Sequence, residues 1–153
     1  VKITGLDKES LQGDRVYSEI FAMKNPDYNL EDCPDLAPVA FAVAAYLGGG
    51  SFSGTRRLKI KESDRAAAMA QELAKFGVRV TVEEDTITVD PESFHAPGET
   101  LDGHNDHRIV MALSLLCTLT GGSISDAEAV RKSYPSFFDD LQRLGVKLQY
   151  GME

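Results

Sequence analysis

Cationic and carboxylate side chains that could bind an anion and transfer a proton gather in four short stretches of the sequence. These are residues 33–35, 61–65, 104–108 and 131–133. Each stretch lies just before, or at the start of, a segment with the apolar spacing of a helix. The first turn of a helix attracts anions and disfavours Lys and Arg. Because an anionic ligand would offset that cost, the four stretches predict one shared anion site.

The candidate residues combine donors for phosphate or carboxylate oxygens with a carboxylate that could move a proton. They are Lys61, Glu62, Arg65, His107, Arg108 and Lys132. Their conjunction, rather than any one residue, favours a functional site. Glu62 stands beside Lys61 and Arg65 and is expected to stay ionised in the free site. Proton delivery by Glu62 would therefore need desolvation when the site closes.

Simpler structural roles are open for several of these positions. Asp35 and Asp106 each stand at a helix start, where a single aspartate commonly caps the helix. Ser63 and Asp64 are equally ordinary capping residues. A lone lysine such as Lys132 is usually a solvated surface charge. Taken singly, each of these residues is explained without a ligand.

Two further patterns are weaker. His104, Asp106 and His107 could suggest a metal site, but the spacing lacks an obvious further ligand, so we expect no metal. The basic residues of 56–61 could instead belong to a strand edge, where positive charge discourages aggregation. Neither pattern by itself predicts a binding site.

An internal repeat organises the elements that must position these residues. Asp35 recurs as Asp106 and Lys61 as Lys132, with the same offset of 71 residues in both cases. Each aspartate precedes a long apolar run that ends at a glycine pair, and a short strand-like stretch follows. One unit is therefore written twice, and the units are expected to superpose and to bring their polar stretches to a common end.

Each repeat unit is expected to contain two helices and several strands. Residues 37–47 and 109–119 are apolar on every face, which is typical of helices buried on all sides. The pattern predicts amphipathic helices over 64–76 and 135–144. Alternation over 78–90 predicts a hairpin, and 146–150 would be the matching strand of the second unit. The fold class is α/β, with repeated strand-helix-strand-helix-strand units around buried helices.

The second helix of the first unit is expected to be half exposed. Met69, Leu73 and Phe76 recur at helical spacing and predict its buried face. The polar residues between them, Gln71, Glu72 and Lys75, are expected to face solvent.

Composition narrows the function classes. The 153 residues carry 24 acidic and 16 basic side chains, a net charge of −8, which disfavours nucleic acid as a partner. The longest apolar runs have eleven residues, whereas a membrane span needs about 20.

Two cysteines and no basic, apolar leader lead us to expect a cytoplasmic protein. The chain opens at Val1 in a strand-like stretch, residues 1–6, so we expect a piece of a longer protein.

Three motifs resemble those of the 5-enolpyruvylshikimate-3-phosphate (EPSP) synthases, also called 3-phosphoshikimate 1-carboxyvinyltransferases. They are KIKESDR at 59–65, HNDHR at 104–108 and RKSYPSFF at 131–138. The resemblance runs through nearly the whole chain, and the KESDR and NDHR pair is its specific part. It implies a two-domain enzyme with three repeated units per domain, in which residues 1–153 form a single domain, most of the C-terminal one. The glycine-rich phosphate segments and the N-terminal part of the site would lie elsewhere.

The resemblance also implies a reaction. The 5-hydroxyl of shikimate 3-phosphate adds to C2 of phosphoenolpyruvate, C3 is protonated, and phosphate is then eliminated. No metal or organic cofactor is implied. Forked Arg donors suit a substrate that carries both phosphate and carboxylate, and a Lys can stabilise charge on the departing phosphate. The fragment alone is expected to be inactive, because such a cleft reacts only when both halves close.

Site roles follow from the resemblance residue by residue. Asp35 matches the carboxylate at the shikimate hydroxyl and is the candidate base; Lys61 matches a lysine beside that hydroxyl. Glu62 matches the acid that handles the C3 proton. The groups that match the phosphoenolpyruvate site are Arg65, His107, Arg108 and Lys132. Arg57 departs from the family, which often has Asn or a similar polar residue there, so no shikimate contact is assigned to it.

Other functions remain open at this point. The related UDP-N-acetylglucosamine enolpyruvyl transferases share the repeat and phosphoenolpyruvate but use another acceptor; the KESDR and NDHR motifs argue against them. A non-catalytic anion-binding module that kept the fold is an alternative from another class. The excised domain could also only associate with itself.

Overall fold

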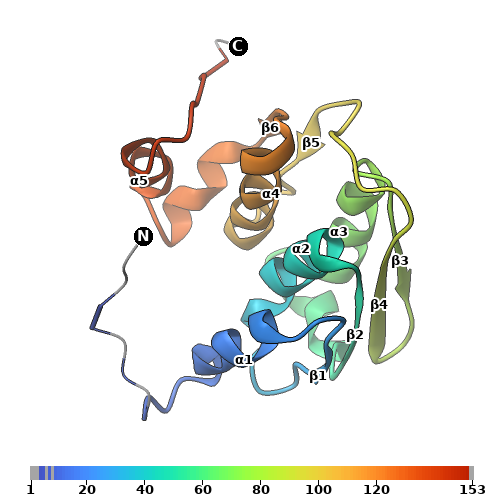
Figure 1. Ribbon diagram of the computed structural model, residues 1–153. Helices are drawn as coiled ribbons and strands as arrows, with labels where there is room; N and C mark the ends of the chain where they lie inside the picture. Colours follow the sequence, from blue (N-terminus) through green and yellow to red (C-terminus); the bar gives the residue numbers. More distant parts are fainter. Residues whose placement is uncertain (1–3, 6, 8, 152–153) are drawn as a thin grey trace.

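Two parallel strand-helix-strand units, one from each half of the repeat, form the centre of the computed structural model, which describes residues 4–5, 7 and 9–151 (Figure 1). In the first, β1 (Asp27–Asn29) and β2 (Gly50–Ser53) flank α2 (Ala37–Leu47), and Tyr28 lies opposite Phe52. In the second, β5 (Leu101–Asp102) and β6 (Ile124–Ser125) flank α4 (His107–Thr120). The predicted repeat is confirmed.

The first unit continues as predicted. Helix α3 (Arg65–Ala74) leads into a hairpin of β3 (Val78–Val82) and β4 (Thr86–Pro91). The hairpin joins the parallel pair in one sheet of order β1-β2-β4-β3, in which β4 is antiparallel to both of its neighbours. The unit therefore runs strand, helix, strand, helix, strand, strand, and the predicted α/β class is confirmed.

The second unit is shorter. After β6, a 3-10 helix (η4, Ala127–Lys132) precedes α5 (Phe137–Arg143). The strand predicted over 146–150 is wrong: within the described chain this stretch is not part of a sheet, because no described strand lies beside it to form a ladder. A 3-10 helix (η1, Gly13–Val16) and α1 (Tyr17–Ala22) precede β1. The strand-like stretch of 1–6 lies largely outside the described residues.

The two apolar helices lie in the core, but neither is buried on all sides as predicted. Tyr46 and Leu47 at the end of α2 and Leu115 and Leu119 on α4 are exposed. Helix α2 packs on α4 and α3 and on β4 of the sheet. Its small residues allow the close approach, and Phe41 packs edge to face against Phe52 with ring centroids 5.1 Å apart. Gly48 ends α2 in the left-handed region (φ 110°), and its N–H bonds to the carbonyl of Ala44. In the described part of the chain, no helix combines the length and apolarity needed to cross a bilayer.

Helix α3 has the predicted apolar face but not the predicted polar one. Met69, Leu73 and Phe76 are fully buried, and Gln71 is exposed. Glu72 was expected at the surface and is fully buried, so that expectation is wrong. The side chain of Lys75 is also mostly covered. Both lie under the segment that runs through β5 to α4, which sequence spacing within one helix does not reveal.

Candidate active site

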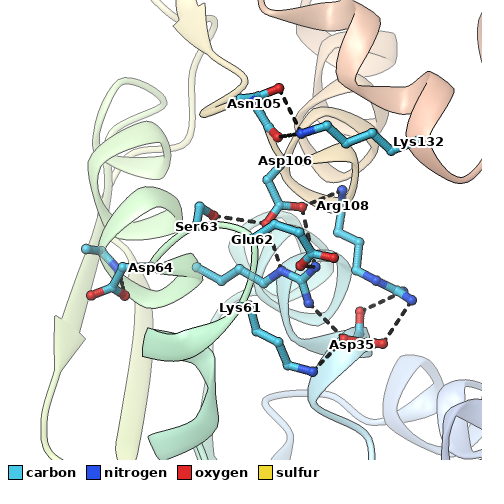
Figure 2. A network of polar contacts seen from close by, with 11 residues as sticks. Asp35, Lys61, Glu62, Ser63, Asp64, Asn105, Asp106, Arg108 and Lys132 are labelled. Atoms are coloured by element: carbon cyan, nitrogen blue, oxygen red, sulfur yellow. Dashed lines mark hydrogen bonds and ion pairs between the residues drawn. The ribbon is translucent and has the colours of Figure 1, made fainter.

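The polar stretches at the starts of α2, α3 and α4 come together in one network (Figure 2). Asp35 lies in a 3-10 turn (η2, Pro34–Leu36) that leads directly into α2. Lys61 follows a second such turn (η3, Arg56–Ile60), and Arg65 opens α3. Arg108 lies in the first turn of α4. Because the repeat places these helix starts side by side, residues up to 73 positions apart are in contact.

Asp35 is the point on which the cations converge. Its Oδ1 accepts from Arg65 Nη1 at 2.8 Å and pairs with Lys61 Nζ at 3.2 Å. Its Oδ2 accepts from Arg108 Nη2 at 3.0 Å, and its backbone carbonyl accepts from Nη1 of the same arginine. Burial would raise the pKa of Asp35, but the hydrogen bonds from Arg65 and Lys61 and the charge of Arg108 outweigh it, so the pKa lies below its usual value. Asp35 is therefore an anion at neutral pH.

Arg65 is enclosed by carboxylates. Its side chain is only 1% exposed. Besides Asp35, its Nε donates to Asp106 at 2.9 Å and its Nη2 to Glu62 at 2.6 Å. Burial would lower the pKa of this guanidinium, but the carboxylates around it, Asp106 foremost, raise it. The geometry makes Arg65 the link that holds three acidic side chains in fixed positions.

Asp106 is the fully buried carboxylate of the network. It caps α4 by accepting from the N–H of Arg108 at 2.9 Å. The same carboxylate accepts from Ser63 Oγ at 2.9 Å and from Arg65. Burial would raise the pKa of Asp106, yet these bonds, the one from Arg65 foremost, hold it below its usual value. The cap anticipated from sequence is present, and it is also a buried ion-pair partner.

Asp106 and Ser63 belong to this network, although reasoning from sequence did not assign them to the site. A signal for Asp106 was available. The repeat pairs Asp35 with Asp106, and both members of that pair contact Arg65. Equivalent positions in two copies of one unit thus share one central cation.

Three remaining candidates lie around this network. Lys132 Nζ donates to the backbone carbonyl of Asn105 and, at 2.8 Å, to its side-chain oxygen. His107 is 7% exposed, and its Nδ1 is buried without a hydrogen-bond partner among the described residues. Burial lowers the pKa of His107, so the ring is neutral at pH 7. Glu62 is partly exposed, and its Oε2 is held by Arg65.

The geometry of the basic stretch decides one of the sequence interpretations. Residues Arg56–Ile60 form a 3-10 helix rather than a strand, so the strand-edge interpretation is wrong. Arg57 is exposed on that turn. Among the described residues, no group of three or more His, Cys, Asp or Glu side chains is placed to hold a metal ion.

Comparisons with known proteins agree with this architecture. The family model for EPSP synthase (3-phosphoshikimate 1-carboxyvinyltransferase) matches residues 1–141. A 3-phosphoshikimate 1-carboxyvinyltransferase of Methanospirillum hungatei is 36% identical over 93% of this chain, and one of Thermococcus kodakarensis is 46% identical over 74%. The chain spans 38% and 28% of the lengths of these two relatives.

A solved structure shows the same fold. An EPSP synthase from Acinetobacter baumannii superposes with a TM-score of 0.69 and 28% identity, over 92% of this chain and 30% of that protein. The repeated units around buried helices are those of the enolpyruvyl transferase fold. Within that class the chain belongs to the EPSP synthase family.

Proposed function

We propose that this chain supplies the C-terminal half of the active site of a 3-phosphoshikimate 1-carboxyvinyltransferase. In the reaction, the 5-hydroxyl of shikimate 3-phosphate gives its proton to a base as its oxygen bonds to C2 of phosphoenolpyruvate, and C3 gains a proton. Loss of a proton from C3 and of phosphate then leaves the enolpyruvyl ether, a step of the shikimate pathway to aromatic amino acids. The observation that carries the proposal is that Lys61, Arg65 and Arg108 all contact Asp35. These three cations come from two separate segments of a chain that belongs to this family.

Phosphoenolpyruvate would bind where the exposed cations are. Lys61 and Arg108 are partly exposed while bound to Asp35, so each has N–H groups left for a ligand. Lys132 is held by Asn105, which directly precedes Asp106 of the network. The unpaired Nδ1 of His107 offers a further polar contact, because a buried polar atom is normally satisfied. These groups suit a small molecule with both a phosphate and a carboxylate.

Arg65 would act on the substrate mainly through its neighbours. The resemblance assigns it to phosphoenolpyruvate, but its donors are directed to Asp35, Glu62 and Asp106. A ligand contact would require one of these ion pairs to open. We therefore assign Arg65 the task of fixing the acidic groups in place.

Glu62 and Asp35 would handle the protons. Glu62 is bonded to Arg65 through one oxygen, and its side chain is 44% exposed, so the other oxygen can meet C3 of the substrate. Asp35 would accept the hydrogen bond of the 5-hydroxyl, with Lys61 beside it. Its lowered pKa makes it a weak base in the open site. Binding of phosphoenolpyruvate to Lys61 and Arg108 in the closed site would weaken their pairing with Asp35 and so strengthen Asp35 as a base.

The rest of the enzyme is the proposed partner of this chain. The chain spans 38% of the Methanospirillum hungatei relative, and a cleft closed by two domains needs both. We propose that residues 1–153 form most of the C-terminal domain, that a further region supplies the remaining shikimate 3-phosphate contacts, and that the enzyme is cytoplasmic. No cofactor enters the proposed reaction.

The test compares the 153-residue chain with the complete enzyme that contains it. Phosphate release is followed with both substrates, and phosphoenolpyruvate binding by isothermal titration. The complete enzyme is expected to release phosphate only when both substrates are present, and the chain alone to bind phosphoenolpyruvate weakly and release none. Product from the chain alone would disprove the two-part site. If the complete enzyme is folded and binds phosphoenolpyruvate but releases no phosphate, the enzyme function is wrong and the alternative of a non-catalytic anion-binding module is supported.

Glu62→Gln in the complete enzyme tests the proton role. The amide keeps the shape and one acceptor for Arg65 but cannot deliver a proton, so kcat should fall roughly a hundredfold. The Kd for phosphoenolpyruvate should stay within about twofold, because no cation is removed. The outcome that contradicts the role is a large loss of affinity with normal turnover.

A further inference from the structure

A second polar network lies further along α3, outside the candidate active site. Its centre is Glu72, which is fully buried. One carboxylate oxygen accepts from the backbone N–H of Asp102 at 2.8 Å and from Lys75 Nζ at 2.9 Å. The other oxygen lies 3.2 Å from His104 Nε2. Lys75 is fixed in turn by the carbonyl of Thr100 at 3.1 Å. A buried carboxylate is costly unless it is fully paired, and this one is.

The segment that Glu72 holds has an unfavourable backbone. His104 and Asn105 are consecutive, both have φ of 49°, and neither is glycine. His and Asn enter this left-handed region more readily than most L-residues, but it is still uncommon, and neighbouring contacts stabilise it here. Glu72 provides two of those contacts, at Asp102 and at the His104 ring. The Asp102 side chain adds a third by accepting from the His104 N–H at 2.7 Å.

The same segment carries residues of the candidate active site. Asn105 holds Lys132 through its carbonyl and its side chain. Asp106 holds Arg65 and caps α4. Helix α3 thus fixes the segment at both ends, with Arg65 bonded to Asp106 (labelled in Figure 2) and Glu72 bonded two turns later to Asp102 and His104.

We propose that Glu72 is a positioning residue for phosphoenolpyruvate binding. It fixes the 102–105 segment in the conformation that directs Asn105 toward Lys132, and so sets where the ammonium group of Lys132 stands. Glu72 touches no reacting atom. The inference rests on the proposed function for the identity of the ligand, and on the contacts above for the effect on Asn105 and Lys132.

Glu72→Gln is the primary test, with Glu99→Gln as the matched control. Glu99 is exposed and lies just before β5, so its replacement changes the same charge without touching the network. Glutamine offers the Asp102 N–H only a neutral and therefore weaker acceptor, and it presents an amide N–H₂ group to Lys75 or to His104. In the complete enzyme, the KM for phosphoenolpyruvate should rise roughly tenfold to a hundredfold, as for a small misplacement of a binding group. The KM for shikimate 3-phosphate should stay within about twofold.

A second variant, His104→Asn, tests the same inference if the Glu72→Gln protein does not fold. His104→Asn keeps a residue that tolerates positive φ but is too short to reach Glu72. It leaves the buried pair of Glu72 and Lys75 intact. Its KM for phosphoenolpyruvate should change in the same direction as that of Glu72→Gln, and by less, because the Asp102 contact remains.

Amide NMR on the 153-residue chain separates this inference from the proposed function. Without any ligand, Glu72→Gln should speed hydrogen exchange at the Asp102 N–H and shift the amide signals of Asn105 and Asp106, while Glu99→Gln leaves them unchanged. If these signals and the KM for phosphoenolpyruvate are unaltered, the inference is wrong. It is equally wrong if both KM values and all amides change together, since that marks a general loss of stability. A wild-type enzyme without turnover would overturn the proposed function, and the NMR comparison would still decide the effect on Asn105.

Discussion

Asp35 and Asp106 occupy the same position in two copies of one unit, yet their surroundings differ. Each stands at the start of an apolar helix, α2 or α4, and each pairs with Arg65. The Asp35 side chain is 37% exposed and is also met by Lys61 and Arg108. The Asp106 side chain is fully buried and is satisfied by Ser63 and by the first turn of its own helix. Asp35 is thus the partly exposed member of the pair, at the proposed substrate site, and Asp106 is the buried member that pairs with Arg65 and caps α4.

The comparison shows how a repeat can divide one role into two. Duplication places two carboxylates at neighbouring helix starts, and a single buried guanidinium pairs with both. Arg65 couples the two aspartates, because both accept hydrogen bonds from its guanidinium. Substitutions should therefore separate a stabilising member of the pair from a catalytic one.

Arg65→Met removes the link and should have the largest effect. It leaves Asp106 buried without its cation, which costs about 3–5 kcal/mol in the free energy of unfolding. Chemical denaturation of the chain measures this loss. Arg56→Met is the control, because Arg56 forms only an exposed pair with Glu84, and it should cost at most about 1 kcal/mol. Equal losses for the two variants would show that Arg65 is not the link.

Asp106→Asn should come next. The amide caps α4 nearly as well as the carboxylate but leaves the buried Arg65 with less compensating charge, so we expect a loss of about 3 kcal/mol. Asp64→Asn is a matched control, because Asp64 caps α3 through the Ala67 N–H at an exposed position. Its expected cost is a few tenths of a kcal/mol, about that of exchanging two good caps. A small loss at both positions would contradict a buried charge role for Asp106.

Asp35→Asn should reduce activity strongly and stability only slightly, the opposite of what is expected for Asp106→Asn. Solvent screens this partly exposed group, so the free energy of unfolding should fall by only about 1 kcal/mol. Turnover of the complete enzyme should fall roughly a hundredfold, because the candidate base is lost. Denaturation and steady-state kinetics on the same variant check the two effects. A stability loss as large as that of Asp106→Asn would remove the distinction between the two aspartates.

Local patterns predicted much of the fold. The apolar run and its glycine end gave the span of α2, and alternation gave the hairpin of β3 and β4. The stretch 146–150 has a similar pattern and is not a strand, because a strand also needs a neighbour that local sequence does not supply. Glu72 was misplaced for a related reason. Helical spacing describes the faces of one helix, whereas the segment that buries Glu72 comes from about 30 residues away.

The sequence predicted most residues of the candidate site but not the contacts between them. The polar helix starts and the motif resemblance pointed to Lys61, Arg108 and Asp35, which the structure brings into contact. They did not show that Arg65 is buried, because a charged residue is normally expected near solvent. Burial of Arg65 depends on three carboxylates from three segments arriving together, which is a property of the assembled fold.

Measuring the free energy of unfolding at decreasing pH should also distinguish the two aspartates. Both have folded-state pKa values below their usual value, so the stability that each contributes is present above about pH 4 and is lost as the pH falls through the lowered pKa. The difference in unfolding free energy between wild type and Asp106→Asn should therefore shrink on acidification, as protonation of wild-type Asp106 removes the same charge. The corresponding difference for Asp35→Asn should shrink as well but start smaller, because solvent screens Asp35. Urea denaturation between pH 7 and pH 3 follows both differences; an Asp106 difference that is constant over this range would mean that its charge does not support the fold.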